Sequence, residues 1–336
     1  MSELNKIALK IISNGKGILA ADESNATMTK RLEAVNVKST PENRLSFREI
    51  LFSSHGMKDY IGGVILYDET INQISSTGKS IPNLISSSGA VPGIKVDTGA
   101  KDLANSPKEK VTEGLDGLRD RLKKYYDLGA RFTKWRGVYS IGENYPSKLA
   151  ISSNAHALAR YSALVQENGM VPIVEPEVLM DGNHSAEVCF NKTSEVIKKC
   201  FEELILHKVD LSGIILKPNM ILAGNLSENK ISSEEVSLKT LECLKNCVPN
   251  EVPGIAFLSG GQSEIEATEN LNLINKNNNT NFIMTYSYGR ALQQSALKVW
   301  SNDIKNVEAT QNTFNHRAKM CSLAAQGKWS SELENK

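Results

Sequence analysis

The sequence predicts a single-domain α/β protein over residues 1–336, built as one (β/α)8 barrel of the TIM type. Short apolar runs recur along the chain, helix-like segments lie between most of them, and several runs are almost continuously apolar. A strand that is apolar throughout is buried on both faces, as in a parallel sheet covered by helices. Eight such strands joined by helices favour a closed barrel. An open doubly wound sheet is the alternative, but no G-x-G-x-x-G motif follows the first run.

Eight runs rich in β-branched residues are expected to form the strands. In chain order they are GILAADE from Gly17, GVILYDE from Gly63, GIKVDTG from Gly93, RFTKWRGVY from Arg131, MVPIVEPEV from Met170, GIILKPNM from Gly213, GIAFLSGG from Gly254 and FIMTYSYGR from Phe282.

Segments with apolar residues at helical spacing separate these runs. The expected helices cover residues 112–128, 144–168, 185–206, 233–244 and 263–274. Ser263 and Glu266 form an S-x-x-E capping box, a stronger start signal than Ser233 followed by Val236. The tail at about residues 328–336 is expected to be frayed.

Composition and charge exclude several classes of function. The chain is 40% hydrophobic and 23% charged, which is ordinary for a globular protein. Because 39 Lys and Arg balance 38 Asp and Glu, neither nucleic acid nor an anionic membrane is expected as a partner. No apolar run approaches the ~18–20 residues of a membrane span, and the start lacks the apolar region of a signal peptide. The sequence therefore predicts a cytoplasmic protein.

The five cysteines argue against a disulfide framework or a structural zinc site, because their number is odd and no paired C-x-x-C spacing occurs. Cys243 and Cys247 are four residues apart in a helical segment and are expected to be small buried apolar residues.

Lys217 is the strongest candidate for a catalytic group. It follows the apolar residues 213–216, and Pro218 ends the run. In the low-dielectric mouth of a barrel, desolvation lowers the pKa of a lysine and frees its amine to attack carbonyl groups. Taken alone, the residue fits better a lysine that extends into solvent.

Ionisable residues at the ends of the other runs favour the catalytic interpretation of Lys217, since seven of the eight runs end in or near a charged residue. In a TIM barrel the carboxyl ends of the strands meet at one face, which carries the active site. The run ends carry Asp22, Asp68, Lys95, Lys134 with Arg136, Glu175 with Glu177, Lys217, Ser259 and Arg290.

Glu175 and Glu177 lie two apart on one strand and so point to the same side. They could donate and accept protons while a carbinolamine forms and loses water. A passive pair bound to Lys134 and Arg136 is the simpler interpretation. Lys134 would also disfavour protonation of Lys217. Asp22, which follows a buried strand, could instead be a helix cap.

Two glycine turns predict a phosphate site. Residues 259–263, Ser-Gly-Gly-Gln-Ser, open a helix, and Gly289-Arg290 repeats the arrangement after the eighth run. Backbone N–H groups at a helix N-terminus bind phosphate, and the loops after strands 7 and 8 are its usual place in a barrel. Glycines also mark any tight strand-to-helix turn, so the prediction depends on both turns and on Arg290 together.

No histidine pair or clustered His and Asp set lies at the run ends. His55, His156, His184, His207 and His316 are scattered and are expected to be surface or structural residues. We therefore expect a reaction without a metal or another cofactor.

These residues carry a resemblance to the class I fructose-bisphosphate aldolases, from about Ile7 to Lys328. The matching stretches are GKGILAADES, GIKVD, KWR, VPIVEPEVL, IILKPNM, FLSGGQSE and SYGRAL. Many long matches in the right order are far more specific than one short motif. The resemblance implies reversible cleavage of fructose 1,6-bisphosphate to dihydroxyacetone phosphate and glyceraldehyde 3-phosphate in glycolysis and gluconeogenesis, in a protein that is typically a homotetramer.

The resemblance also implies a role for each matching position. Lys217 would form a Schiff base with dihydroxyacetone phosphate, and the protonated imine would accept the electrons of the broken bond. Glu175 would be the acid and base of this step, supported by Glu177 and Lys134, and Asp22 would take the C4 hydroxyl proton. The substrate-binding positions would be Ser259, Gly260, Ser287, Gly289 and Arg290 at the C1 phosphate end, and Arg31, Lys95 and Arg136 at the distal end.

Two features depart from the family pattern. Asn25-Ala26-Thr27 stands where many relatives have Gly and Ser, so Thr27 would take over a phosphate contact. Animal and plant relatives end in a longer tail with a terminal tyrosine that assists proton transfer, whereas this sequence stops at Lys336. Another group or water would then carry that proton, and the short tail resembles bacterial members.

Three functions remain open at this point. The first is the bisphosphate aldolase, including one that also accepts sedoheptulose 1,7-bisphosphate. The second is another Schiff-base barrel enzyme, such as a transaldolase-like transferase, which would require an acceptor aldehyde. The third is a non-catalytic binding protein on this scaffold. Lys217, Glu175 and Asp22 together argue against the third, because a binding protein gains nothing from a desolvated lysine.

Overall fold

The computed structural model describes residues 1–335, and Lys336 lies outside the described part. The barrel strands are β1 (Gly17–Ala21), β2 (Ile61–Leu66), β3 (Val91–Lys95), β6 (Phe132–Tyr139), β7 (Val171–Val178), β8 (Ile215–Leu216), β9 (Gly254–Phe257) and β10 (Ile283–Tyr288). Within residues 1–335 they close into one parallel barrel in the order β1-β10-β9-β8-β7-β6-β3-β2. This confirms the predicted TIM barrel, and each strand overlaps one of the eight predicted runs.

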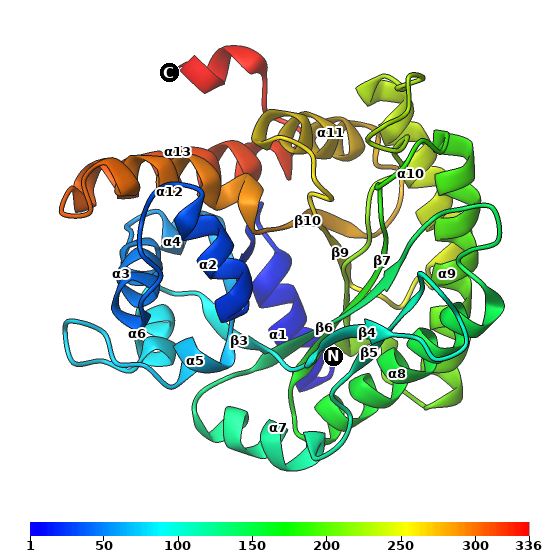
Figure 1. Cartoon of the computed structure of the whole chain (residues 1–336), viewed down its shortest axis with the longest axis horizontal. Helices are drawn as coiled ribbons and strands as arrows, with labels where there is room; N and C mark the ends of the chain where they lie inside the picture. Colours follow the sequence, from blue (N-terminus) through cyan, green and yellow to red (C-terminus); the bar gives the residue numbers. More distant parts are fainter. Residues whose placement is uncertain (336) are drawn as a thin grey trace.

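Helices surround the barrel in a ring, which Figure 1 shows in a view close to the barrel axis. They are α1 (Glu3–Ile12), α2 (Asn25–Glu33), α3 (Pro41–Phe52), α4 (Met57–Tyr60), α5 (Asp68–Ile71), α6 (Ile81–Ser87), α7 (Leu118–Asp127), α8 (Lys148–Glu167), α9 (Ala186–Leu206), α10 (Ser233–Cys247), α11 (Glu264–Asn277), α12 (Arg290–Asn302) and α13 (Val307–Ala324), with short 3-10 turns at Leu211–Gly213 and Ser331–Asn335. None of these described helices is long and apolar enough to cross a bilayer.

Helix α1 closes the amino-terminal end of the barrel and lies at the centre of the ring in Figure 1. Its residues Ala8, Ile11 and Ile12 are fully buried against the apolar side chains of the barrel interior. The approach is so close that a Cβ on Gly62 would lie 1.8 Å from the backbone oxygen of Ile11. The barrel is therefore a packed core whose polar mouth is at the carboxyl ends of its strands.

Every second residue of a strand points to the same side, so the inward-facing positions of one strand run from the apolar amino-terminal end of the barrel to its charged carboxyl-terminal end. On four strands a buried apolar residue of the inner core lies two or four positions before an ionisable one. These pairs are Ile18 and Asp22 at β1, Phe132 and Lys134 on β6, Ile173 and Glu175 on β7, and Ile215 and Lys217 at β8.

The helix predicted over residues 112–128 is wrong at its start. Thr112 belongs to a short strand, β5 (Lys110–Glu113), which pairs antiparallel with β4 (Gly99–Asp102). The Thr112 N–H donates to Asn154 Oδ1 at 3.0 Å, and its hydroxyl donates to the Arg136 carbonyl at 2.6 Å. Helix α7 begins only after Gly117, whose φ of +65° interrupts the helical backbone.

One other helix start also differs from the predicted one. The segment expected from residue 144 becomes helical at Lys148, because Pro146 precedes it and Ser147 caps it through the Ala150 N–H. Helix α10 begins at Ser233, as predicted, but its capping box is formed by Ser232 and Glu235, one residue before the signal considered at Ser233.

Two residues of the tail that was expected to be frayed at about residues 328–336, Trp329 and Glu334, contact the helix ring; Lys336 lies outside the described residues. Trp329 is buried, with its backbone N–H donating to Asn272 Oδ1 at 3.0 Å. Its indole N–H donates to Glu334 Oε1 at 2.8 Å, and the other oxygen of Glu334 pairs with Arg317. The sequence signal for this contact was one aromatic residue in a polar stretch.

We expect Trp329→Ala to destabilise the fold, because it empties a buried site and leaves Glu334 without the indole donor. The loss in free energy of unfolding should be about 3 kcal/mol, which lowers Tm by about 4 °C in a chain of this length. Thermal unfolding followed by circular dichroism measures it. Lys328→Ala, at the exposed neighbouring position, is the control and should change Tm by less than about 2 °C. Equal Tm values for the two variants would contradict the docked tail.

Candidate active site

A cavity of about 780 Å³ opens at the carboxyl ends of the barrel strands. Every residue predicted for the catalytic and substrate-binding site lines it. These are Asp22, Thr27, Arg31, Lys95, Lys134, Arg136, Glu175, Glu177, Lys217, Ser259, Gly260, Ser287, Gly289 and Arg290. The cavity has the size usual for a small-molecule site.

Four buried ionisable residues form a chain of alternating charge at the bottom of this cavity. Lys217 Nζ lies 3.0 Å from Glu175 Oε1, and Lys134 Nζ lies 3.1 Å from Glu175 Oε2. Lys134 Nζ also lies 2.8 Å from Asp22 Oδ2. The side chains of Lys217, Glu175 and Lys134 are 4–5% exposed and that of Asp22 is 12% exposed. Each carboxylate therefore has an ammonium group within ion-pair distance.

The charges hold one another ionised against the effect of burial. Burial raises the pKa of Asp22, but Lys134 and Lys217 outweigh it and lower that pKa to about 2. Burial likewise raises the pKa of Glu175, and Lys134, Lys217 and Arg136 again reverse the shift to below the usual value. Burial lowers the pKa of Lys134, but Asp22 and Glu175 raise it overall. Both carboxylates are thus proton acceptors in the free protein at neutral pH.

A second layer of ion pairs lies above this chain. Arg136 pairs with Glu177, which outweighs burial and raises the pKa of the guanidinium group. Lys95 pairs with the carboxylate of Asp97 and donates to its backbone oxygen at 2.9 Å. Asp97 Oδ2 also accepts the Arg136 N–H at 3.3 Å, which ties β3 to β6. Each carboxylate that lines the cavity is therefore paired with Lys or Arg.

Asp97 is a site residue that the sequence reasoning missed. It lies two residues after Lys95 in the run GIKVDTG, a spacing that could have indicated a shared side. The predicted Asp68, in contrast, does not line the cavity, and its carboxylate accepts the Tyr125 hydroxyl at 2.7 Å. Thr27 lies at the exposed rim, in the first turn of α2, where its N–H donates to Ser24 Oγ at 3.3 Å.

Arg31 reaches the cavity from α2 and is held there by residues of neighbouring elements. It pairs with Glu23, whose backbone oxygen accepts the buried Arg48 at 2.8 Å. It also donates to Gln293 Oε1 at 3.4 Å, and Gln293 is anchored on the Ala20 carbonyl. The Nε and Nη2 atoms of Arg31 are buried without a partner in the described structure. A buried unpaired guanidinium donor is costly unless an anion binds to it.

The two glycine turns follow β9 and β10, the strands that come after β1 in the barrel order β1-β10-β9, and line the cavity beside Arg31. Gly260 and Gly261 have φ values of +56° and +81°, which a residue with a Cβ rarely adopts. They lead into α11, and Gly289 leads into α12, so two helix N-termini face the cavity. Ser287 Oγ lies between them, buried and without a partner in residues 1–335. Donors of this kind at helix N-termini bind phosphate.

Fold and site together define a barrel in which a buried lysine, paired with a carboxylate, lies in a cavity whose walls carry helix N-termini and buried donors without partners in residues 1–335. This is the arrangement of an enzyme that acts on a phosphorylated carbonyl compound through an amine nucleophile.

Comparison with known proteins identifies the family. The family model for class I fructose-bisphosphate aldolases matches residues 3–336. A Xanthomonas campestris protein named probable fructose-bisphosphate aldolase class 1 is 48% identical over 98% of this chain and 99% of its own length. Fructose-bisphosphate aldolase 4, cytosolic, from Arabidopsis thaliana is also 48% identical, over 99% of this chain and 85% of its own.

A solved structure agrees. Fructose-bisphosphate aldolase from Plasmodium falciparum, crystallised with TRAP and a small-molecule inhibitor, superposes with a TM-score of 0.96 at 44% identity, covering 98% of this chain and 95% of its own. The chain belongs to the class I fructose-bisphosphate aldolase family, a family of aldehyde-lyases.

We expect Asp22→Asn to reveal the depressed pKa of Asp22 through the pH dependence of stability. A carboxyl group whose pKa is lower in the folded state stabilises the fold above its unfolded pKa, and this contribution disappears as the pH falls through the folded value. The wild type should exceed the variant by about 2 kcal/mol at pH 6, and the difference should vanish between about pH 4 and pH 2.

Urea unfolding at a series of pH values measures this difference. Asp120→Asn, at an exposed position of α7, is the matched control and should differ from wild type by less than about 0.5 kcal/mol throughout. A constant difference for Asp22→Asn from pH 6 down to about pH 2.5 would show that the Asp22 carboxylate is not held ionised by its neighbours.

Proposed function

We propose that the chain reversibly cleaves fructose 1,6-bisphosphate to dihydroxyacetone phosphate and glyceraldehyde 3-phosphate through a Schiff base on Lys217. The observation that carries the proposal is the position of the Lys217 amine, 4% exposed and 3.0 Å from Glu175 Oε1, at the bottom of the cavity. Family membership supports the cleavage of fructose 1,6-bisphosphate. The ion pairs that link Lys217, Glu175, Lys134 and Asp22 support Lys217 as the residue that forms the Schiff base.

Formation of the Schiff base requires a proton to leave the amine and later to return. Glu175, ionised in the free protein, accepts a proton from Lys217, whose nitrogen then attacks the C2 carbonyl to form a carbinolamine. The protonated Glu175 donates to the C2 hydroxyl, which leaves as water and gives the protonated imine. Lys134, bonded to the other oxygen of Glu175, fixes the carboxylate for both transfers.

Cleavage uses the carboxylate at the other end of the chain. Asp22 takes the proton of the C4 hydroxyl, the C3–C4 bond breaks, and its electrons move to the imine to give an enamine and glyceraldehyde 3-phosphate. Protonation of the enamine at C3 and addition of water to the imine release dihydroxyacetone phosphate and restore Lys217. The low pKa of Asp22 means that it returns its proton readily, as a reversible reaction requires.

The unpaired donors of the cavity suit the two phosphates. The glycine turns, Ser287 and Arg290 would bind the C1 phosphate, and Arg31, with its two free donor atoms, would bind the distal end together with Lys95 and Arg136. We further propose a homotetramer in the cytoplasm that acts in glycolysis and gluconeogenesis. Support for the location comes from relatives named cytosolic, and support for the assembly from family membership alone.

Reduction with borohydride in the presence of dihydroxyacetone phosphate should place an adduct on Lys217, located by peptide mass mapping. Lys217→Met should give no adduct and lose at least about 10³-fold in cleavage rate, because the nucleophile is gone. Lys123→Met, at an exposed lysine of α7, is the control and should behave like wild type.

An adduct on another lysine, or near-normal cleavage by Lys217→Met, would disprove the assignment. The assay also separates the alternatives. Cleavage in the absence of any acceptor aldehyde supports the aldolase, and a requirement for an acceptor would indicate the transaldolase-like transferase.

Arg290→Met should raise KM for fructose 1,6-bisphosphate by about 10–100-fold, because it removes a charge-assisted contact to phosphate. Steady-state kinetics with inorganic phosphate as competitive inhibitor measures the effect, and the inhibition constant should rise in parallel. Lys298→Met, on the exposed face of the same helix, is the matched control. An unchanged KM would remove Arg290 from the phosphate site.

A further inference from the structure

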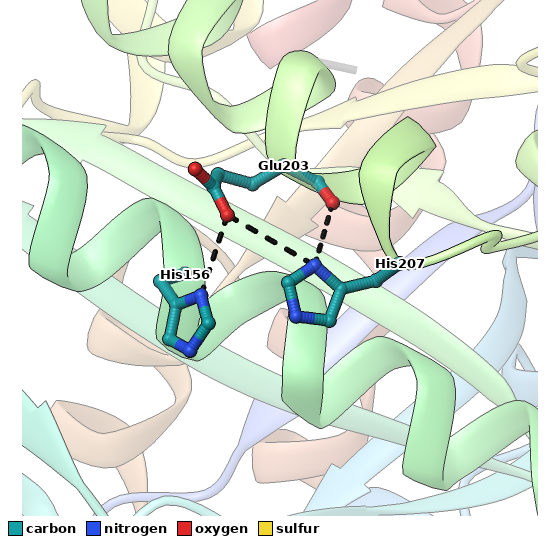
Figure 2. A group of neighbouring side chains, drawn as sticks. All are labelled: His156, Glu203 and His207. Carbon is teal, nitrogen blue, oxygen red and sulfur yellow. Dashed lines mark hydrogen bonds and ion pairs between the residues drawn. The ribbon is translucent and has the colours of Figure 1, made fainter.

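Two helices on the outside of the barrel bring together a second group of chemically active side chains. Helices α8 and α9 lie side by side (Figure 1). His156 projects from α8, and Glu203 and His207 project from the end of α9, four residues apart on one face. Figure 2 shows the Glu203 carboxylate near both imidazole rings. None of the three residues lines the active-site cavity.

The ligand-type atoms of this group converge on one point. His156 Nδ1 lies 3.3 Å from Glu203 Oε2, and His207 Nδ1 lies 3.9 Å from the same oxygen. One nitrogen from each ring and one carboxylate oxygen all lie within 4.8 Å of one another. The rings meet edge to face, with centroids 5.0 Å apart.

We propose that His156, Glu203 and His207 bind a divalent transition-metal ion of the Zn²⁺ class, with water as the fourth ligand. Two imidazoles and one carboxylate are a donor set that suits zinc and leaves an open position. Bonds of about 2.0–2.1 Å in a tetrahedron separate the ligand atoms by about 3.4 Å. The His156–Glu203 pair, at 3.3 Å, already has about this separation, and the ligand atoms of the other pairs, which lie within 4.8 Å, must close by up to about 1.4 Å.

The exposure of the side chains permits that closure. The His156 side chain is 52% exposed and that of His207 is 22% exposed, so both rings can turn and an ion can enter from solvent. Glu203 is 13% exposed and is held by its neighbours, which makes it the fixed member of the group. His207 Nδ1 also lies 2.9 Å from the Glu203 backbone oxygen. If the Nδ1–H donates to this oxygen, as in the usual outer contact of a metal-binding histidine, Nε2 carries the free lone pair and is the ligand atom of His207.

Lys199 is the group that opposes a cation here. Its Nζ lies 3.0 Å from Glu203 Oε1, the carboxylate oxygen that faces away from His156. It also lies 3.3 Å from Glu202 Oε2 and can keep that partner when a metal occupies the group. Glu203 Oε2 is therefore available to a metal ion, but the positive charge of Lys199 lowers the affinity for a cation. Replacement of Lys199 by an uncharged residue should raise the metal affinity.

Metal binding would join α8 to α9 and stabilise the folded chain, because an ion that binds only the folded state raises its stability. Since the group lies outside the active-site cavity, we expect the cleavage rate to be independent of it. This inference does not depend on the proposed aldolase reaction.

The test titrates the full chain, stripped of metal with a chelator that is then removed, with ZnCl₂ by isothermal titration calorimetry. The expected result is one zinc ion per chain and a Tm that rises with zinc concentration. His156→Ala and His207→Ala should each weaken binding at least about tenfold, since even outer-sphere changes cost 10–100-fold. Lys199→Met should bind more tightly than wild type. Sugar-phosphate cleavage by each variant checks that it is folded.

The matched control is His316→Ala. His316 Nε2 lies 3.4 Å from Glu334 Oε2, so this residue forms the same kind of pair without a third ligand among residues 1–335. Its replacement should leave the zinc affinity unchanged. Stoichiometric binding that survives in the His156→Ala/His207→Ala double variant would place the ion elsewhere and overturn the proposal. Absence of saturable binding up to about 1 mM zinc, where a site worth about 4 kcal/mol is half filled, would overturn it as well.

Discussion

The structure of the active site depends on the buried chain of alternating charges that joins Asp22, Lys134, Glu175 and Lys217. Each of these groups comes from a different barrel strand or from the residue after it, and each would be too costly to bury alone. Lys134 is the central member, because it forms an ion pair with a carboxylate on either side. Ion pairing therefore links four strands to one another while it holds Lys217 in a buried position.

This arrangement is possible because the opposite end of the barrel is closed. Helix α1 packs its apolar face onto the inner core, so water reaches the interior only from the mouth. Inward-facing positions then change from apolar to ionisable within one step of the strand repeat. The apolar floor lowers the local dielectric beneath Lys217 and Glu175, which strengthens every pairwise interaction in the chain above it. The apolar core at the amino-terminal end of the barrel and the ion-paired groups at its carboxyl-terminal end therefore belong to one continuous packed interior.

Much of this could be predicted from the sequence, because strand periodicity is local. The runs ending at Asp22, Lys134, Glu175 and Lys217 indicated strands, and parallel pairing then required their ends to meet. Contacts between distant segments were not predictable in the same way. Neither the closure by α1 nor the pairing of His156 with Glu203 leaves a pattern in a single stretch of chain. The end of β5 was predicted as helix because the residues that follow it, from Leu115 to Tyr125, carry helical spacing. The pairing with β4, the contact to Asn154 and the turn at Gly117 separate the strand from α7.

Within residues 1–335, hydrogen-bond donors without partners lie at the walls of the cavity and not among the charged groups at its centre, which separates substrate binding from the proposed chemistry. At its centre every charged group has a partner, so the reacting residues are positioned before a substrate arrives. At its walls Arg31 and Ser287 keep buried donors without partners, at a cost in stability that only a bound acceptor removes. Binding of two phosphates at these walls would complete the hydrogen bonding and press the carbonyl carbon between them toward Lys217. Binding energy from the ends of the substrate can then be used where the bond breaks, which is how remote contacts accelerate a reaction.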